Sequence, residues 1–451
     1  MTRLPRVAIG TIQPEADPQL ILWALMDVFH RHGVQVQSFL SRACFPAYRG
    51  AAAITGLNPR FLDSWIMSPD TCREVFVRGA EAADLALVEG QYDSESEGHR
   101  EGGRLEPLCR WLDLPRVIVL DVAQLDQCRL PPPPDWADGL LLDRVRDADH
   151  AARLTTELES LWGIPVLGAL EALPWLRADL GSIPRGARLP RELCHRLGDQ
   201  FARYCRRNRL LELASRRELP ATPRRSTYTS RTRTGLTVAI AYDDAFNGYF
   251  PETLDLLEMR GASVVDFSPL RDETLPPQAD LVYFGCGHPE RYAATLSENH
   301  CMAAALRSHL CAGRRIYSEG GGTAYLCQQM ETPDGDFRRM VGILPAIARL
   351  VDNPGPIEPV ELSLSETNWL GSKGDRLRGY LNASWRLEPL ANLRNFVAEQ
   401  DYRYCLVGTF QCIGSLLHLN FGAHPAFLDH FFFPETPPEV LDRQPASVWP
   451  A

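Results

Sequence analysis

The residues with the clearest chemical potential lie in the segment Ser318-Glu-Gly-Gly-Gly322, which follows a short apolar run and precedes a helix-like stretch. A sharp strand-to-helix turn presents one side chain, and its flanking glycines relieve a crowded backbone, so such turns often carry a nucleophile. The expected nucleophile position is Gly320, which has no side chain. The segment therefore predicts a nucleophile elbow without its nucleophile, although a glycine-rich turn is also typical of a simple tight connection.

A second candidate site is the loop at 10–19, which follows a predicted buried strand. Phosphate loops use glycine N–H groups, a lysine for the β- and γ-phosphates, and a Ser or Thr hydroxyl for magnesium. Where the lysine and the hydroxyl are expected, this loop has Asp17 and Pro18. We therefore interpret it as a degenerate nucleotide-binding loop in which Gly10 and Thr11 keep the expected residue types.

Two carboxylates, Glu89 and Asp121, end further predicted strands. Ligands of parallel α/β sheets bind at the carboxyl ends of the strands, so both side chains are candidate magnesium ligands. Carboxylates at strand ends are also common as helix caps and solvated loop residues, and without a phosphate loop this second interpretation is favoured. The cysteines have no Cys-x-x-Cys pair and no zinc-like spacing, so reduced and mostly buried thiols are expected.

The elements that position these residues alternate between strands and helices in both halves of the chain. In the first half we expect helices at 20–30 and 193–213, and strands at 7–11, 34–39, 83–90, 116–121, 139–145 and 164–168. In the second half we expect helices at 253–258 and 304–310, and strands at 237–241, 263–267, 280–285 and before the glycine turn. This alternation predicts an α/β fold with parallel sheets covered on both faces.

With 451 residues, the chain is long enough for two or three domains. We expect a first domain at 1–216, a basic linker at 217–234 and a second domain at 235–445. The formal net charge of −10 argues against nucleic acid as a partner, and no apolar run is long enough to span a membrane. The N-terminus lacks the apolar region of a signal peptide, so a cytoplasmic location is expected.

Short motifs occur in order along nearly the whole chain: Leu62-Asp-Ser-Trp-Ile-Met67, Val88-Glu-Gly90, Ala245-Phe-Asn-Gly-Tyr-Phe-Pro-Glu252, Phe267-Ser-Pro-Leu270, His288-Pro-Glu290 and Ser318-Glu-Gly-Gly-Gly322. Together they resemble the cobyrinic acid a,c-diamide synthase family. The resemblance implies an N-terminal P-loop-NTPase-like domain, related to dethiobiotin synthetase, and a C-terminal class I glutaminase-like α/β sandwich. It also implies amidation of carboxylates on a corrin or related tetrapyrrole, with ATP and magnesium forming an acyl phosphate and glutamine supplying ammonia.

The resemblance places the family's catalytic cysteine on Gly320, after the matching Glu319, and its catalytic histidine on His418. The glycine pair beside the oxyanion hole falls on Cys286 and its successor, and the phosphate loop falls on 10–19. Cys286 is thus a candidate displaced nucleophile, although a cysteine at a strand end is usually a small buried hydrophobe. This chain therefore departs from the family at both of its catalytic sites.

Three functions are compatible with the sequence. We favour a catalytically degenerate homologue, a pseudoenzyme that binds a tetrapyrrole or corrinoid, or a partner enzyme of that pathway, through the cleft between its domains. The alternatives are an active ATP-dependent amidotransferase of cobalamin biosynthesis and a structural or regulatory subunit. ATP and magnesium would be needed only if the family activity is retained, and the resemblance also suggests a homodimer.

Overall fold

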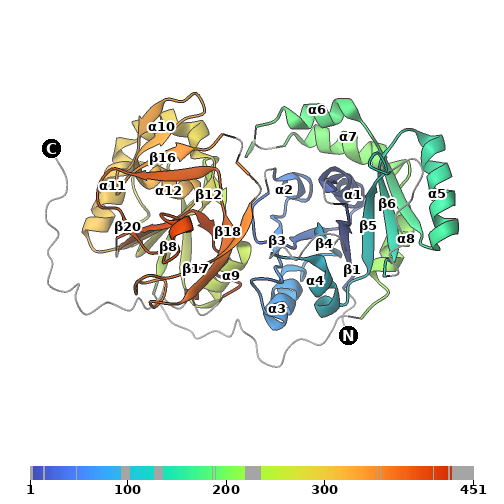
Figure 1. Cartoon of the computed structure of the whole chain (residues 1–451), viewed down its shortest axis with the longest axis horizontal. Coiled ribbons are helices and arrows are strands. Elements are labelled where there is room, and N and C mark those ends of the chain that lie inside the picture. The colour runs from blue at the N-terminus through green and yellow to red at the C-terminus, as the bar shows by residue number, and fades with distance from the viewer. Residues whose placement is uncertain are drawn as a thin grey trace. The chain divides into compact units, whose positions relative to one another are not determined.

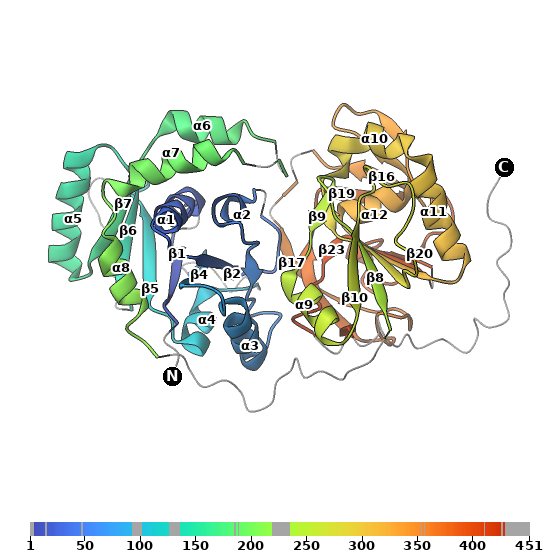
Figure 2. The same cartoon turned by 180° about the vertical axis from the view of Figure 1, so that it is seen from behind.

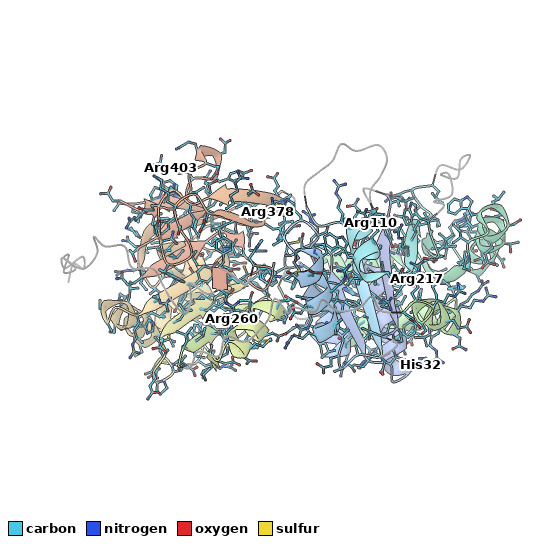
Figure 3. All side chains as sticks on the ribbon, turned by 90° about the horizontal axis from the view of Figure 1, so that it is seen from below. His32, Arg110, Arg217, Arg260, Arg378 and Arg403 are labelled. Carbon is cyan, nitrogen blue, oxygen red and sulfur yellow. The ribbon has the colours of Figure 1, made fainter. Side chains whose placement is uncertain are left out.

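The computed structural model describes residues 4–13, 16–46, 48–92, 102–125, 136–184, 186–187, 189–218, 235–352, 354–355, 357–409, 411–424 and 427–428. The chain divides into two compact units, Met1–Thr229 and Ser230–Ala451, which are coloured blue to green and yellow to red in Figure 1. Most of the expected linker lies outside the described residues. Its first residue, Arg217, which is labelled in Figure 3, belongs structurally to the first unit, because it forms ion pairs with Asp113 and Asp138.

A seven-stranded parallel sheet forms the centre of the first unit, with strand order β3-β2-β4-β1-β5-β6-β7. Its strands are β1 (Arg6–Thr11), β2 (Val36–Leu40), β3 (Arg60–Phe61), β4 (Leu85–Gln91), β5 (Arg116–Asp121), β6 (Gly139–Val145) and β7 (Val166–Glu171). The strands are nearly continuous apolar runs because a parallel sheet is buried on both faces. The strand order reverses direction at β1, and ligands of such sheets bind at the carboxyl ends of strands near this reversal.

Helices cover both faces of this sheet, and Figure 2 shows α3 and α4 on one face and α1 and α7 on the other. The helices of the first unit are α1 (Gln19–Arg31), α2 (Gly50–Thr55), α3 (Pro69–Gly79), α4 (Leu105–Leu112), α5 (Ala148–Trp162), α6 (Pro174–Gly181), α7 (Arg191–Ala202) and α8 (Arg207–Ala214). Their ends follow local chemistry. For example, the Asp147 side chain caps the start of α5, and Gly163, with φ of 65°, ends it.

The prediction of one helix at 193–213 is wrong, because α7 and α8 are separate. Between them, the backbone N–H of Arg206 donates to the carbonyl of Leu167 on β7, outside the helical pattern. The Arg206 guanidinium also pairs with Glu159 on α5. Tertiary contacts with two neighbouring elements therefore interrupt a stretch whose local sequence favours a continuous helix.

The second unit contains another seven-stranded sheet, in order β10-β8-β11-β13-β22-β21-β20, whose first five strands are parallel. These strands are β8 (Thr237–Ala241), β10 (Ser263–Phe267), β11 (Leu281–Phe284), β13 (Arg315–Glu319), β20 (Arg394–Asn395), β21 (Leu406–Gly408) and β22 (Cys412–Ser415). Its helices are α9 (Pro251–Met259), α10 (Ala293–Glu298), α11 (His300–Cys311) and α12 (Gly321–Leu326), with short 3₁₀ turns at Pro289–Tyr292 and Gln400–Tyr402.

Three smaller sheets complete the second unit. They consist of β9 (Phe246–Gly248) with β12 (Cys286–Gly287); β14 (Cys327–Glu331), β15 (Phe337–Arg339), β16 (Leu344–Leu350) and β19 (Trp385–Pro389); and β17 (Glu358–Ser363), β18 (Arg376–Leu381) and β23 (Leu417–His418). Each unit has its own apolar core. The predicted α/β fold class is confirmed. Within the described residues, no helix is both long and apolar enough to cross a membrane.

Candidate functional site

The glycine turn lies where β13 meets α12. Gly320 has φ of 49° and ψ of −115°, a conformation that residues with a side chain rarely adopt. Its N–H donates to the carbonyl of Ser415 on the neighbouring strand β22 at 2.8 Å. The next two glycines allow close packing, because a Cβ on Gly321 would lie 2.5 Å from Pro289 and a Cβ on Gly322 2.7 Å from Phe284. The backbone thus makes the sharp turn that the sequence predicts.

Two side chains lie close in front of Gly320. A Cβ placed on Gly320 would lie 3.1 Å from Sγ of Cys286 and 3.2 Å from Nδ2 of Asn382. Both separations are tighter than ordinary contact distances, so both side chains would have to move for even one methyl group. The thiol and the amide therefore lie directly beside the place where a side chain at the elbow would begin.

Cys286 lies on β12 and is 4% exposed. Burial raises the pKa of its thiol well above the usual value, and the nearby Glu319 raises it further. The Sγ atom donates a long hydrogen bond to Oε2 of Glu319 at 4.0 Å. Because the thiolate is the nucleophilic form of cysteine, this environment favours an unreactive, protonated thiol.

Glu319, the last residue of β13, is completely buried. The hydroxyls of Tyr283 and Tyr317 donate to its Oε1 at 3.2 and 2.9 Å. Burial nevertheless raises the pKa of Glu319 to about 8, against the lowering effect of these donors and of the Leu419 N–H. The carboxyl group is therefore mostly protonated at neutral pH.

His418, the expected general base, lies on β23 opposite Tyr380 of β18. It precedes Leu419, whose N–H reaches Glu319, so the chain brings His418 into the neighbourhood of the elbow. The ring is 2% exposed, and burial lowers its pKa to about 4. His418 is thus held in the neutral form that a general base requires, but the elbow offers it no thiol to activate.

In the loop after β1, the described residues make contacts within the protein. A Cβ on Gly10 would lie 2.4 Å from the carbonyl oxygen of Gly90, so close packing of β1 on β4 accounts for this glycine. The buried Thr11 hydroxyl accepts the N–H of Gln13. The Gln13 side chain then exchanges two hydrogen bonds with the backbone of Asp121, at 3.1 and 2.8 Å. The described part of the loop is thus tied to the end of β5, while residues 14 and 15 lie outside the described chain.

The two candidate magnesium ligands are also engaged within the protein. Glu89 accepts a hydrogen bond of 2.8 Å from Ser38, and burial raises its pKa to about 7. Asp121 accepts from the N–H of Ala123, from Gln124 and from Arg144. Over the described ranges, no cluster of three or more His, Cys, Asp or Glu side chains is arranged to hold a metal ion. Among the residues that the structure describes, Glu89 and Asp121 therefore do not fit a magnesium–nucleotide site.

Sequence reasoning missed the roles of Asn382, Tyr283 and Tyr317 beside the elbow. Asn382 directly follows β18 in the chain. Residue spacing does not show that its amide lies close to Gly320. The two tyrosines belong to strands that were predicted, and their pairing with Glu319 follows from the parallel register of β11 and β13.

Comparisons with known proteins cover both units. A family model described as a CobB/CobQ-like glutamine amidotransferase domain matches residues 237–425. The cobyrinate a,c-diamide synthase of Dehalococcoides mccartyi strain CBDB1 is 28% identical over 458 residues, covering 95% of this chain and 97% of the relative. The protein of the same name from Syntrophotalea carbinolica is 29% identical over 396 residues, covering 83% and 85%. The one from Salmonella typhimurium is 27% identical over 441 residues, covering 90% and 93%.

Among solved structures, a glutamine amidotransferase aligns with 43% of this chain and 97% of its own length, at 15% identity and a TM-score of 0.33. The structure titled PurLQS from Thermotoga maritima aligns with 44% of this chain and 99% of its own, at 12% identity and a TM-score of 0.33.

Proposed function

We propose that the chain is a diverged, catalytically degenerate homologue of the cobyrinate a,c-diamide synthases to which it is similar, and that it binds a corrinoid or related tetrapyrrole without amidating it. The ligand class is taken from the name shared by the relatives. The observation that supports a loss of activity is the geometry at Gly320, which has no side chain and has Cys286 and Asn382 packed directly beside it.

Glutamine hydrolysis requires a thiolate that attacks the carboxamide, a base that activates it, and donors for the oxyanion. Gly320 supplies no sulfur. The nearest thiol, Cys286, is buried and held protonated beside a largely neutral carboxyl group. Loss of a catalytic nucleophile typically costs several orders of magnitude in turnover, so glutamine is not expected to serve as a nitrogen donor.

Free ammonia would bypass the missing thiol but not the second requirement. A carboxylate becomes electrophilic only after phosphorylation, which needs ATP and magnesium held beside it. In this chain Gln13 ties the first loop to Asp121, and the Asp121 carboxylate is satisfied by protein donors. These contacts support a loss of the synthetase reaction as well.

Titration of the full chain with cobyrinate, monitored by visible absorbance, tests the proposal. We expect saturable binding that is unchanged by ATP and magnesium, and mass spectrometry should find no carboxamide product with either glutamine or ammonium. An ATP-dependent carboxamide product would show an active amidotransferase. Absence of both binding and product would favour a structural or regulatory subunit. Either result would overturn the proposal.

A further inference from the structure

Two buried carboxylates lie side by side at the carboxyl edge of the first sheet. Asp121 ends β5, Asp143 lies near the end of β6, and the two are direct partners in the parallel register. They are 1% and 2% exposed. Neighbouring strands are about 4.8 Å apart, so two ionised carboxylates in this position would repel each other strongly without a counter-charge.

Arg144 supplies that charge from an unusual backbone conformation. Its φ is 62°, in the left-handed region that residues with a side chain seldom occupy, and the pairing of β6 with β7 is irregular between Leu142 and Val145. The Arg144 N–H donates to Oδ1 of Asp143 at 2.9 Å, while its guanidinium reaches Oδ2 of Asp121 at 3.1 Å. One residue thus bridges both carboxylates.

Arg177 of α6 adds a second positive charge beside Asp143. Its Nη2 lies 2.6 Å from Oδ1 of Asp143, and its Nε donates to the carbonyl of Ala172. The remaining Asp121 contacts come from the N–H of Ala123 and the side chain of Gln124. Both carboxylates therefore find their positive charge and hydrogen-bond donors within the protein, where a nucleotide-binding sheet would direct such oxygens to a metal.

We propose that Arg144 is a built-in cation that replaces a divalent metal at this edge of the sheet, so that the first unit is metal-independent. A surface salt bridge alone does not explain the left-handed backbone, because an arginine in an ordinary strand conformation would carry the same charge. The left-handed backbone at Arg144 is explained if it directs the guanidinium from β6 to the Asp121 carboxylate on the neighbouring strand β5. This inference stands apart from the ligand of the whole protein.

The test compares the full-length wild-type chain with R144Q. The wild type should show the same melting temperature in EDTA and in millimolar Mn²⁺, and no heat of Mn²⁺ binding. R144Q should have a lower melting temperature than the wild type in EDTA, and Mn²⁺ should restore the wild-type value. We expect R144Q to bind Mn²⁺ with a dissociation constant of about 0.1–1 mM, as in weak carboxylate sites. R146Q is the matched control, since exposed Arg146 contacts His150 instead, and should behave like the wild type.

Two further variants keep the test decisive. R144K preserves a positive charge and should show no response to Mn²⁺. R144G removes the guanidinium while relieving the left-handed backbone, so it should fold, and respond to Mn²⁺, even if R144Q does not fold. The proposal is overturned if wild-type protein binds Mn²⁺ in a manner lost in D121N. It is equally overturned if the folded neutral variant gains no stability from Mn²⁺.

Discussion

At Gly320, the lack of a side chain is matched by the approach of two others. The Cys286 thiol and the Asn382 amide would lie 3.1 and 3.2 Å from a Cβ atom on Gly320, although both residues are far from it in sequence. A sulfur introduced at position 320 would therefore lie beside the Cys286 thiol, and we expect the two thiols to react with each other.

The variant G320C should form a disulfide with Cys286. The Cβ added at position 320 would lie 3.9 Å from the Cβ of Cys286. The two Cβ atoms of a disulfide are usually about 3.5–4.5 Å apart, so this distance suits a disulfide. After mild oxidation, thiol titration of the denatured variant should find two fewer free thiols than after reduction, and peptide mapping should identify the cross-link. The control C286A/G320C should lose none. An elbow sulfur that stays free after oxidation would contradict the described geometry.

Glu319 is predicted to make stability pH-dependent. Its pKa in the folded protein is about 8, above the ordinary value of 4.5, so the folded state holds a proton that the unfolded state releases. The free energy of unfolding of the wild type, relative to E319Q, should therefore fall as pH rises from about 4.5 to about 8 and then level off. One proton corresponds to a slope of at most about 1.4 kcal/mol per pH unit.

Denaturant unfolding of both proteins across this range measures the effect. The neighbouring Cys286, Tyr283 and Tyr317 do not titrate in this window, because burial raises their pKa values. Glutamine keeps an acceptor for the two tyrosines, so E319Q is a conservative reference. Parallel stability curves for the two proteins would show that Glu319 is ionised in the folded state.

Between elements, the packing of α1 on α7 depends on a buried polar contact. Asp27 of α1 is 1% exposed and pairs with Arg31 at 2.8 Å and with His195 of α7 at 2.6 Å. Gly198 of α7 lies directly against it, because a Cβ there would be 1.9 Å from Oδ2 of Asp27. Gly198 is therefore needed so that the buried Asp27 side chain can keep its contacts with Arg31 and His195.

The variant G198A should separate α7 from α1 and destabilise the first unit by roughly 1–3 kcal/mol, the usual cost of overpacking. Hydrogen–deuterium exchange should become faster in both helices, and the melting temperature should fall. The matched control is G181A at the end of α6, where a Cβ would have no neighbour within 4 Å. Equal behaviour of the two variants would show that the Asp27 contact has no effect on helix packing.

For the whole molecule, apolar runs alternating with helical patterns predicted the α/β class and most of the parallel strands. Segments such as Arg116–Asp121 and Ser263–Phe267 became strands with the expected bounds. Spacing could not predict the break between α7 and α8, the left-handed Arg144, or the approach of Asn382 to Gly320. Each depends on contacts between segments that are distant in the sequence. Such contacts override the local secondary-structure preference or cannot be recognised from it. The catalytic roles assigned from sequence stay predictions.

The most direct test of the central claim is glutamate release by the full chain supplied with glutamine, ATP, magnesium and cobyrinate, measured beside C286A. The account predicts that neither protein releases glutamate above the enzyme-free background, because the elbow has no nucleophile and the nearest thiol is protonated and buried. Wild-type turnover that C286A abolishes would show that Cys286 acts as the nucleophile, and would contradict the proposal that this chain is catalytically degenerate.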